Sequence, residues 1–439
     1  MKSAPTVNKV MRNHAPRAIK NNPGWFTPHQ QRVLHKLIDC RTAAMGCQAF
    51  QCGDCGENAF RHASCHDRHC TTCGGEKREL WQQRVLAMQL PVQTLHLVFT
   101  LPHEFNPLIL ANQTLLIGLF LTAVKNTLTR TLRDDFQCQA GLSQVLHTWG
   151  QRMNTHVHCH VLVFAGGPSL DESHWVTIPT DVPHPICPLR LAESFRKRFL
   201  RRLRWEYKRR NLALPDALRQ LDSLAKFNQW LKPIRQKLWK VHSQKPPAHC
   251  HDATAAIKYL SHYMTGTAIG NHRILADDGE YVTIRVKSYR KKCHEELRLH
   301  GEEFVKRFVQ HILPPRCMRV RYAGFLAGSH REEKLALCRR LLGVTDRGDE
   351  EELLEGEEDG EESFGGDSDR FVREDRARFP LRCPRCGRPE MRSLGHFDAF
   401  ATAHLLAERI AFWERVHTVA STFENLPFEY PFELPLPET

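Results

Sequence analysis

Six cysteines fall within residues 47–73, and this cluster constrains the local fold more strongly than any other feature of the chain. Cys52 and Cys55 form one C-x2-C pair and Cys70 and Cys73 form a second, with fourteen residues between the inner cysteines. Two such pairs can place four thiolates around one tetrahedral zinc ion, and a loop of about this length suits closure of the site. The pattern predicts a structural Zn²⁺ site, because four thiolates leave no open position for catalysis.

The spacing does not fix the complete ligand set. Cys47, Cys65, His66 and His69 lie in or beside the loop, so Cys65 is a further candidate ligand and a second zinc ion stays open. The alternative is a set of buried free cysteines, which the polar and charged surroundings disfavour.

A weaker cysteine pattern lies near the C-terminus. Cys383 and Cys386 form a C-x2-C pair that has no adjoining second pair. Its candidate partners are Cys317, Cys338 and His396, so this pair predicts a metal site less strongly than the N-terminal pairs do.

The charge of the chain is high and unevenly distributed. The formal net charge is +13, and residues 349–362 hold ten acidic side chains and no basic one, which leaves 13 + 10 = +23 on the rest. Such an excess indicates a polyanionic partner, most commonly nucleic acid, rather than solubility alone. No apolar run approaches the ~20 residues that span a bilayer, and the first residues do not resemble a signal peptide. We therefore expect a cytoplasmic protein without membrane contact, in which clustered cysteines bind metal rather than form disulfides.

The length of 439 residues predicts two or three domains. We expect a zinc-binding and DNA-binding domain over 1–90, a second domain over 91–345, an acidic disordered linker over 346–380 and a small C-terminal module with the C-x2-C pair over 381–439. Alternating or apolar runs predict strands, and apolar residues at helical spacing predict helices. The strands are 94–100, 156–164, 281–287 and 318–326, and the helices are 29–39, 76–90, 108–132, 190–210, 252–264, 302–313 and 400–415.

Three histidines alternate along one of these strands. His156, His158 and His160 are two residues apart, so their imidazoles line one face of the strand. Two imidazoles from one strand can hold a divalent metal and leave its other positions open to water or phosphate oxygens. The alternative is simple packing, which is the commoner role of a lone strand histidine.

Two predicted helices carry further candidate functional residues. Residues 190–210 hold ten basic and two acidic side chains. Arg196, Arg198, Arg201 and Arg202 are its candidate DNA-phosphate contacts, and the alternative is a solvated face. In the helix over 252–264, two of the chain's seven tyrosines follow each other at i, i+4 and share one face. They are Tyr259 and Tyr263, and without other features they would be interpreted as ordinary boundary tyrosines.

Taken in order, these motifs resemble a known family. The order runs through the cysteine pairs, Leu97-Val98-Phe99-Thr100-Leu101-Pro102, the histidine strand with Gly166-Gly167, Tyr259-Leu260-Ser261-His262-Tyr263, Phe304-Val305-Lys306-Arg307-Phe308, Leu313-Pro314 and Arg321-Tyr322-Ala323-Gly324-Phe325-Leu326-Ala327. The chain is similar over roughly residues 30–330 to the rolling-circle transposases of the insertion-sequence ninety-one family, which are two-tyrosine members of the HUH endonuclease superfamily.

The resemblance implies a fold, a site and a reaction. The fold is α+β, with an antiparallel ferredoxin-like or RRM-like sheet and helices, preceded by a small zinc-binding domain. His158-Cys159-His160 corresponds to the histidine–hydrophobic–histidine motif that binds Mg²⁺ or Mn²⁺, although His156-Val157-His158 also fits and His156 can be a third ligand. Tyr259 and Tyr263 correspond to the two nucleophiles.

The implied activity is that of a transposase which cleaves and rejoins single-stranded DNA through a 5′-phosphotyrosine intermediate. The implied partners are single-stranded element ends and target DNA. The implied location is the bacterial nucleoid, and a homo-oligomer stays open. The alternatives are a rolling-circle replication initiator or relaxase, which uses the same chemistry, and a non-enzymatic zinc-containing DNA-binding regulator. A histidine-bound zinc hydrolase is least favoured, because the H-E-x-x-H pattern is absent.

Overall fold

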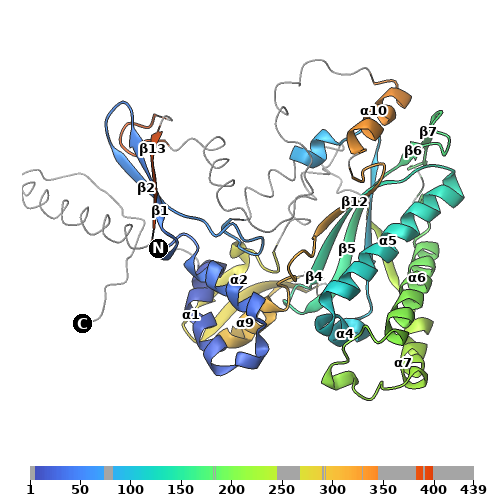
Figure 1. Cartoon of the computed structure of the whole chain (residues 1–439), viewed down its shortest axis with the longest axis horizontal. Coiled ribbons are helices and arrows are strands. Elements are labelled where there is room, and N and C mark those ends of the chain that lie inside the picture. Colours follow the sequence, from blue (N-terminus) through green and yellow to red (C-terminus); the bar gives the residue numbers. More distant parts are fainter. Residues whose placement is uncertain are drawn as a thin grey trace, which may run out of the picture. The chain divides into compact units, whose positions relative to one another are not determined.

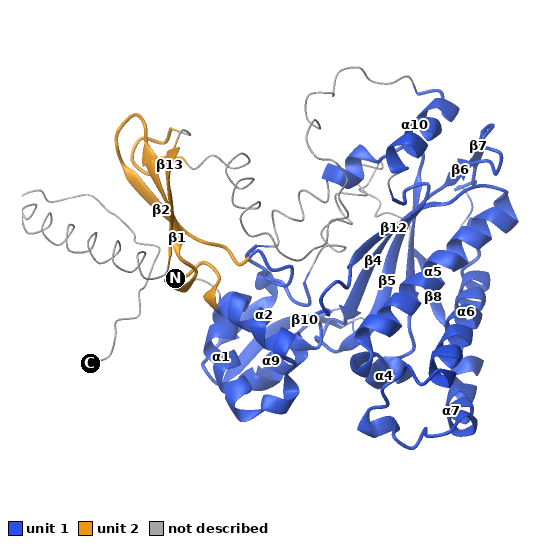
Figure 2. Cartoon of the chain, viewed as in Figure 1, with its two compact units in different colours: residues 1–38, 66–368 blue, residues 39–65, 369–439 orange. Residues whose placement is uncertain are grey.

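The computed structural model (Figure 1) describes residues 5–73, 83–180, 182, 184–244, 267–288, 291, 293–328, 330–344, 382–388 and 391–398. The chain divides into two compact units (Figure 2). Unit 1 comprises Met1–Ile38 and His66–Ser368, and unit 2 comprises Asp39–Cys65 and Asp369–Thr439. The division into domains at residues 90, 345 and 380 stays a prediction from the sequence.

The main sheet of unit 1 has five antiparallel strands in the order β12-β4-β5-β3-β8. The central strand β5 contains the three alternating histidines, and its Cys159 lies opposite Leu146 of β4 and Phe99 of β3. An α+β fold built on an antiparallel sheet is thereby confirmed. The strands are β3 (Thr94–Thr100), β4 (Gly141–Trp149), β5 (Thr155–Phe164), β8 (Lys240–Gln244) and β12 (Val320–Gly324).

Helices cover one face of this sheet (Figure 1). Val157, Cys159 and Val161 point from β5 into the hydrophobic core between the sheet and the helices, where the ring of Phe195 packs edge-on against Phe99 with centroids 5.4 Å apart. Burying alternate apolar residues of β5 in this core directs the intervening histidines to the opposite face. The helices of this layer are α4 (Asn106–Ala111), α5 (Gln113–Phe136), α6 (Pro188–Lys208) and α7 (Leu224–Gln236).

A second sheet in unit 1 has the order β11-β10-β9 and packs with the helices α1 and α9. Nε2 of His14 in α1 lies within hydrogen-bond distance of Oδ1 of Asp277 in β9, at 2.8 Å, and the two side chains are 0% and 3% exposed. Gly301, the first residue of α9, allows the His14 ring to approach, because a Cβ there would lie 1.9 Å from His14 Nδ1. The elements are α1 (Val7–Asn21), α2 (Pro28–Asp39), β9 (Ile274–Asp277), β10 (Tyr281–Ser288), β11 (Cys293–His300) and α9 (Gly301–Val309).

Unit 2 contains a three-stranded antiparallel sheet in the order β13-β1-β2. Its strands are β1 (Cys47–Cys52), β2 (Asn58–His62) and β13 (Met391–Phe397).

Unit 1 also has the small hairpin β6 (Gly166–Pro168) with β7 (Trp175–Thr177), and the helix α10 (Arg331–Leu341). The short 3-10 helices are η1 (Pro23–Trp25), η2 (Ala43–Met45), η3 (His103–Phe105), η4 (Asp216–Leu218) and η5 (Asn271–Arg273).

Most of the predicted elements in described parts of the chain are confirmed. The strand over 94–100 has the predicted bounds, and the basic helix over 190–210 is α6, two residues displaced. The helices predicted over 252–264 and 400–415, residues 76–82 of the helix predicted over 76–90 and the linker over 346–380 lie outside the described residues. Within the described residues, no helix combines the length and apolarity needed to cross a membrane.

Candidate active site and metal centres

Histidines gather on the face of the main sheet opposite the helices, which we call the histidine face. It carries His156, His158 and His160 of β5, His147 of β4 and His96 of β3. His147 lies directly opposite His158 in the antiparallel ladder, and its ring contacts both His158 and His160, with centroids 5.2 and 4.7 Å apart. The strand register therefore adds histidines from both neighbouring strands to those of β5.

Three of these histidines can share one metal ion. Among the described residues, His147, His158 and His160 each offer a ring nitrogen, and these atoms all lie within 4.8 Å of one another. His156, the third ligand considered from the sequence, is exposed and is not part of this group. The structure thus brings together the later histidine pair and adds His147, which is almost fully buried.

The hydrogen bonds at the histidine face orient the two β5 ligands. Nδ1 of His158 donates to the backbone carbonyl of His156 over 2.9 Å, which leaves Nε2 as the nitrogen with a free lone pair. Nδ1 of His160 lies 2.9 Å from Nε2 of His96. If the His160 nitrogen is the donor of this pair, Nε2 of His160 is likewise directed to the metal position, and His96 acts as a positioning residue.

Burial keeps these imidazoles neutral. Desolvation is the main cause that lowers the pKa of His158 and of His160 to about 3, and it lowers the pKa of His96 to about 4. A neutral imidazole has a lone pair for a metal ion, whereas an imidazolium has none. The histidine face is therefore suited to binding a cation near neutral pH.

The two candidate nucleophiles, Tyr259 and Tyr263, lie outside the described residues. Their position with respect to the histidine face stays a prediction from the sequence.

The cysteine pairs are distributed differently from the expected single cluster. Cys52 and Cys55 lie in unit 2 with the C-terminal pair Cys383 and Cys386, and the four sulfur atoms are within 4.8 Å of one another. Cys70 and Cys73 belong to unit 1, where Nδ2 of Asn8 lies 3.3 Å from the sulfur of Cys70. Sequence spacing alone could not reveal this arrangement, because the partner of the first pair lies more than three hundred residues away.

His69, one of the residues beside the predicted zinc loop, has a structural role. Its Nδ1 is 2.8 Å from Asp67, and its Nε2 accepts a hydrogen bond of 3.2 Å from the backbone N–H of Leu313. Both ring nitrogens are thus engaged, and burial lowers the pKa of His69 to about 4. The adjacent Arg68 donates to the carbonyls of Cys317, Leu313 and Pro314 over 2.6, 3.2 and 2.9 Å. Arg68 and His69 therefore hold their segment against the loop after α9 through hydrogen bonds.

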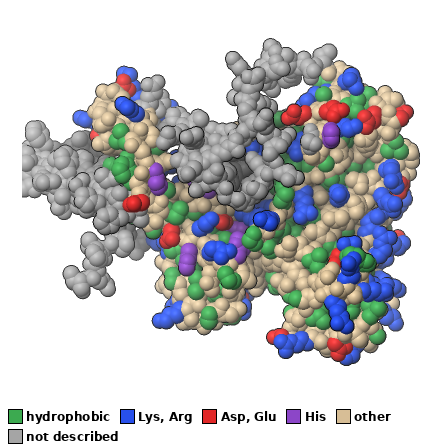
Figure 3. Space-filling model, in the orientation of Figure 1, with side chains coloured by type: hydrophobic (Ala, Val, Ile, Leu, Met, Phe, Trp, Pro, Cys, Tyr) green, Lys and Arg blue, Asp and Glu red, His purple; other side chains and the backbone are tan. Residues whose placement is uncertain are grey.

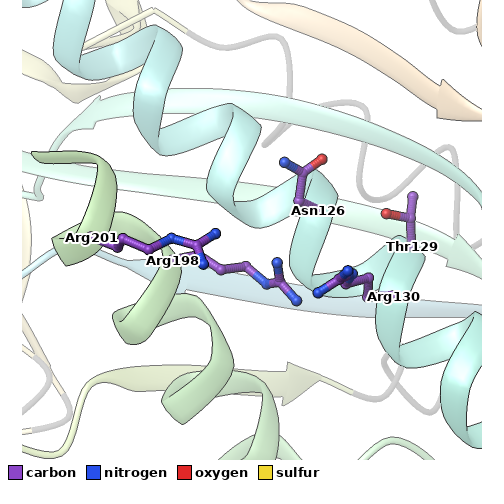
Figure 4. A pocket seen from close by; sticks show the side chains of 5 residues that line it. All are labelled: Asn126, Thr129, Arg130, Arg198 and Arg201. Carbon is purple, nitrogen blue, oxygen red and sulfur yellow. The ribbon is translucent and has the colours of Figure 1, made fainter. Parts of the chain in front are cut away.

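The basic residues of α6 do not all face the same surroundings. Arg198 and Arg201 line a pocket of about 350 Å³ together with Asn126, Thr129 and Arg130 of α5 (Figure 4). Figure 4 shows Arg198 and Arg130 reaching toward each other from the two helices. Desolvation, together with the charges of Arg130 and Arg201, lowers the pKa of Arg198. Three guanidinium groups around one pocket favour binding of an anion.

The other two candidate arginines of α6 contact protein groups. Arg196 donates to the backbone carbonyl of Lys237 over 3.2 Å, and Arg202 forms an ion pair of 2.9 Å with Glu206 while stacking over the ring of Trp205. Figure 3 shows Lys and Arg side chains gathering along the edge of unit 1 where α5 and α6 lie. The helical layer thus presents a strongly basic surface.

His147 and His96 were not predicted as site residues from the sequence. Both are single histidines in strands that are otherwise mostly apolar, LSQVLHTW and TLHLVFT. A polar residue at a strand position that is expected to be buried can indicate a site residue. Which other side chains it meets is known only when the strand register is known.

Comparison with known proteins gives a consistent result. The family described as "Transposase zinc-binding domain" matches residues 10–101, and the family described as "Putative transposase" matches residues 141–334. A protein of Sinorhizobium fredii named "Putative transposase y4qJ" is 34% identical over 349 residues, which cover 78% of this chain and 86% of that protein. The transposase for insertion sequence element IS801 of Pseudomonas savastanoi pv. phaseolicola is 28% identical over 350 residues, covering 74% of this chain and 79% of the relative. No solved structure matches significantly.

Proposed function

The chain belongs to the insertion-sequence ninety-one family of transposases, and we propose that it cleaves and rejoins single-stranded DNA by the rolling-circle route. The observation that carries this proposal is the group formed by His147, His158 and His160 on the side of the main sheet opposite the helices. A regulator that only binds DNA has no need for imidazoles that converge on one face of a sheet. The histidine face therefore favours an enzyme over a zinc-containing regulator.

The three imidazoles fit a divalent transition-metal ion. Their ligand atoms lie within 4.8 Å of one another, close enough for one ion to contact all three nitrogens. Nitrogen donors suit transition metals better than Mg²⁺, which prefers oxygen ligands, so Mn²⁺ fits this donor set better than Mg²⁺ does. A bound ion would polarise a phosphoryl oxygen and neutralise the charge that develops during attack.

The nucleophiles in this proposal are Tyr259 and Tyr263, as the family resemblance implies. The phenol oxygen of one tyrosine attacks the scissile phosphorus, the bond from phosphorus to the 3′ oxygen breaks, and the leaving 3′ oxygen takes up a proton. The product is a 5′-phosphotyrosine and a free 3′-OH, so the phosphodiester energy is conserved and rejoining requires no ATP. A second tyrosine allows the enzyme to hold one end while it cuts another.

The pocket of Arg130, Arg198 and Arg201 provides a separate contact for DNA. It lies in the helical layer, on the other side of the main sheet from the histidines. We assign it to backbone phosphates that flank the cleaved position rather than to the scissile phosphate. Such contacts add affinity that depends on salt and not on sequence.

The test is formation of a covalent adduct between the protein and single-stranded DNA. The full-length protein is incubated with Mn²⁺ and an oligonucleotide that carries a candidate element end and a label at its 3′ end, because the 5′-phosphotyrosine joins the protein to the downstream fragment. A labelled band at protein mass on a denaturing gel is expected. The band should disappear in the Tyr259→Phe/Tyr263→Phe double variant and persist in Tyr281→Phe, whose ring packs under Arg298 and belongs to β10 of the second sheet.

The opposite result would redirect the interpretation. If none of the ends gives an adduct with any divalent metal while the protein still binds duplex DNA tightly, the chain acts as a zinc-containing DNA-binding regulator. If an adduct forms equally in the double tyrosine variant, another nucleophile performs the reaction.

A further inference from the structure

We propose that Cys52, Cys55, Cys383 and Cys386 form a structural zinc site that joins the C-terminal segment to the N-terminal hairpin of unit 2. Neither matching family extends to the C-terminal pair, since the matches end at residue 334. The inference is independent of the nuclease chemistry proposed above, because it concerns only unit 2.

The distances between the sulfur atoms suit a tetrahedral thiolate site. The sulfur of Cys52 is 3.6 Å from that of Cys386, and the sulfur of Cys55 is 3.5 Å from that of Cys383. Zinc–sulfur bonds of ~2.3 Å in a tetrahedron separate neighbouring sulfurs by about 3.8 Å. A disulfide requires about 2.05 Å, and each of the four cysteines is unpaired in that sense.

The two C-x2-C pairs have the same backbone conformation although they are far apart in sequence. In the first, the N–H of Cys52 donates to the carbonyl of Glu57 and the N–H of Gly56 donates to the carbonyl of Cys52. In the second, the N–H of Cys383 donates to the carbonyl of Arg388, and the N–H of Gly387 donates to the carbonyl of Cys383.

The glycines of these two turns also match. Gly56 has a φ of +69° and Gly387 has a φ of +72°, a left-handed conformation that favours glycine. In the C-terminal turn the N–H of Cys386 also points at the sulfur of Cys383 over 3.5 Å, an interaction that stabilises negative charge on sulfur. Two equivalent turns facing each other form the two halves of one metal site.

The sheet of unit 2 brings the two turns together. Strand β13 pairs antiparallel with β1, so that Cys52, at the end of β1, lies opposite Met391, which follows the C-terminal turn. Arg388 and Asp54 form an ion pair of 3.3 Å between the two turns. Cys52 and Cys383 are each 2% exposed, although this small sheet has few large apolar side chains to bury them. Sheets of this size commonly need a metal or disulfide to be stable.

Zinc content per chain tests the proposal directly. Elemental analysis of the full-length protein is compared with Cys383→Ser/Cys386→Ser, with Cys52→Ser/Cys55→Ser and with the variant that carries all four changes. Each double variant should lose one zinc ion per chain, and the fourfold variant should lose no more than either. A matched control, Cys187→Ser/Cys293→Ser, removes two exposed cysteines and should keep the full zinc content.

A milder substitution guards against misfolding. Cys386→His should retain the ion, because imidazole often replaces one thiolate, and the Co²⁺-loaded protein should lose part of its sulfur-to-cobalt charge-transfer absorption. Full zinc content in Cys383→Ser/Cys386→Ser, additive losses in the fourfold variant, or an unchanged cobalt spectrum in Cys386→His would each overturn the shared site.

Discussion

Exchanging His147 for leucine tests which histidine completes the metal group. Leucine has a similar volume and no ligand atom, so His147→Leu removes the ligand from the buried position beside the Trp149 ring without leaving a large cavity. We expect His147→Leu to have a lower affinity for Mn²⁺ than the wild type. His156→Leu, which changes an exposed side chain of the same sheet face, should bind Mn²⁺ with almost the affinity of the wild type. The His156 group that matters is its backbone carbonyl, which fixes His158 and survives the substitution.

The size of the effect follows from the position of His147 among the ligands. Loss of a partner that only orients a ligand weakens metal binding by about 10–100-fold. Because His147 offers its own nitrogen to the metal position, we expect a loss of at least about 100-fold, equivalent to about 2.7 kcal/mol. His96→Leu removes only the hydrogen-bond partner of His160. Its affinity for Mn²⁺ should therefore lie between that of the wild type and that of His147→Leu.

Isothermal titration of the zinc-loaded, full-length protein with Mn²⁺ measures these affinities without requiring DNA cleavage. Urea unfolding of each variant shows whether the fold is retained. The reasoning fails if His147→Leu binds Mn²⁺ within about threefold of the wild type, or if His156→Leu loses as much affinity as His147→Leu. The latter outcome would make His156 the third ligand.

Three further predictions concern the surroundings of the site. Arg68→Met should lower the free energy of unfolding by about 3 kcal/mol in urea, because three carbonyls lose a charged donor, and an unchanged midpoint would contradict this. Gly301→Ala should cost about 1–3 kcal/mol, measured as a lower melting temperature, since its Cβ would meet the buried His14 ring. Arg198→Gln/Arg201→Gln should weaken DNA binding and reduce the slope of log K against log salt by about 2, whereas an unchanged slope would exclude phosphate contact by this pocket.

Local patterns in the sequence were sufficient for several elements. The strand Thr94–Thr100 and the helix Pro188–Lys208 follow from apolar spacing, because burial of one face imposes a period of two on a strand and 3.6 on a helix. The same alternation places His158 and His160 together on one face of β5. These predictions depend only on neighbours in the chain, and they are confirmed.

Partnerships between distant segments could not be predicted in this way. The sequence offered Cys70 and Cys73 as the natural partners of the first cysteine pair because they are near, and the structure instead joins that pair to the C-terminal turn. A short loop lowers the entropy of closure, but the dependence on loop length is weak, so proximity in sequence is a poor guide to ligand sets.

By itself, the sequence determined the residue types, their period and their order: cysteine pairs that bind metal, a strand with alternating histidines, a basic helix and the family resemblance. Only the tertiary structure decided which strands are neighbours. The register of β4 against β5 brings His147, and not His156, into the group with His158 and His160, and the pairing of β13 with β1 brings the two cysteine pairs of unit 2 together. The physical reason is that a metal ion requires donors converging from several directions, and one strand or one turn supplies donors from one direction only.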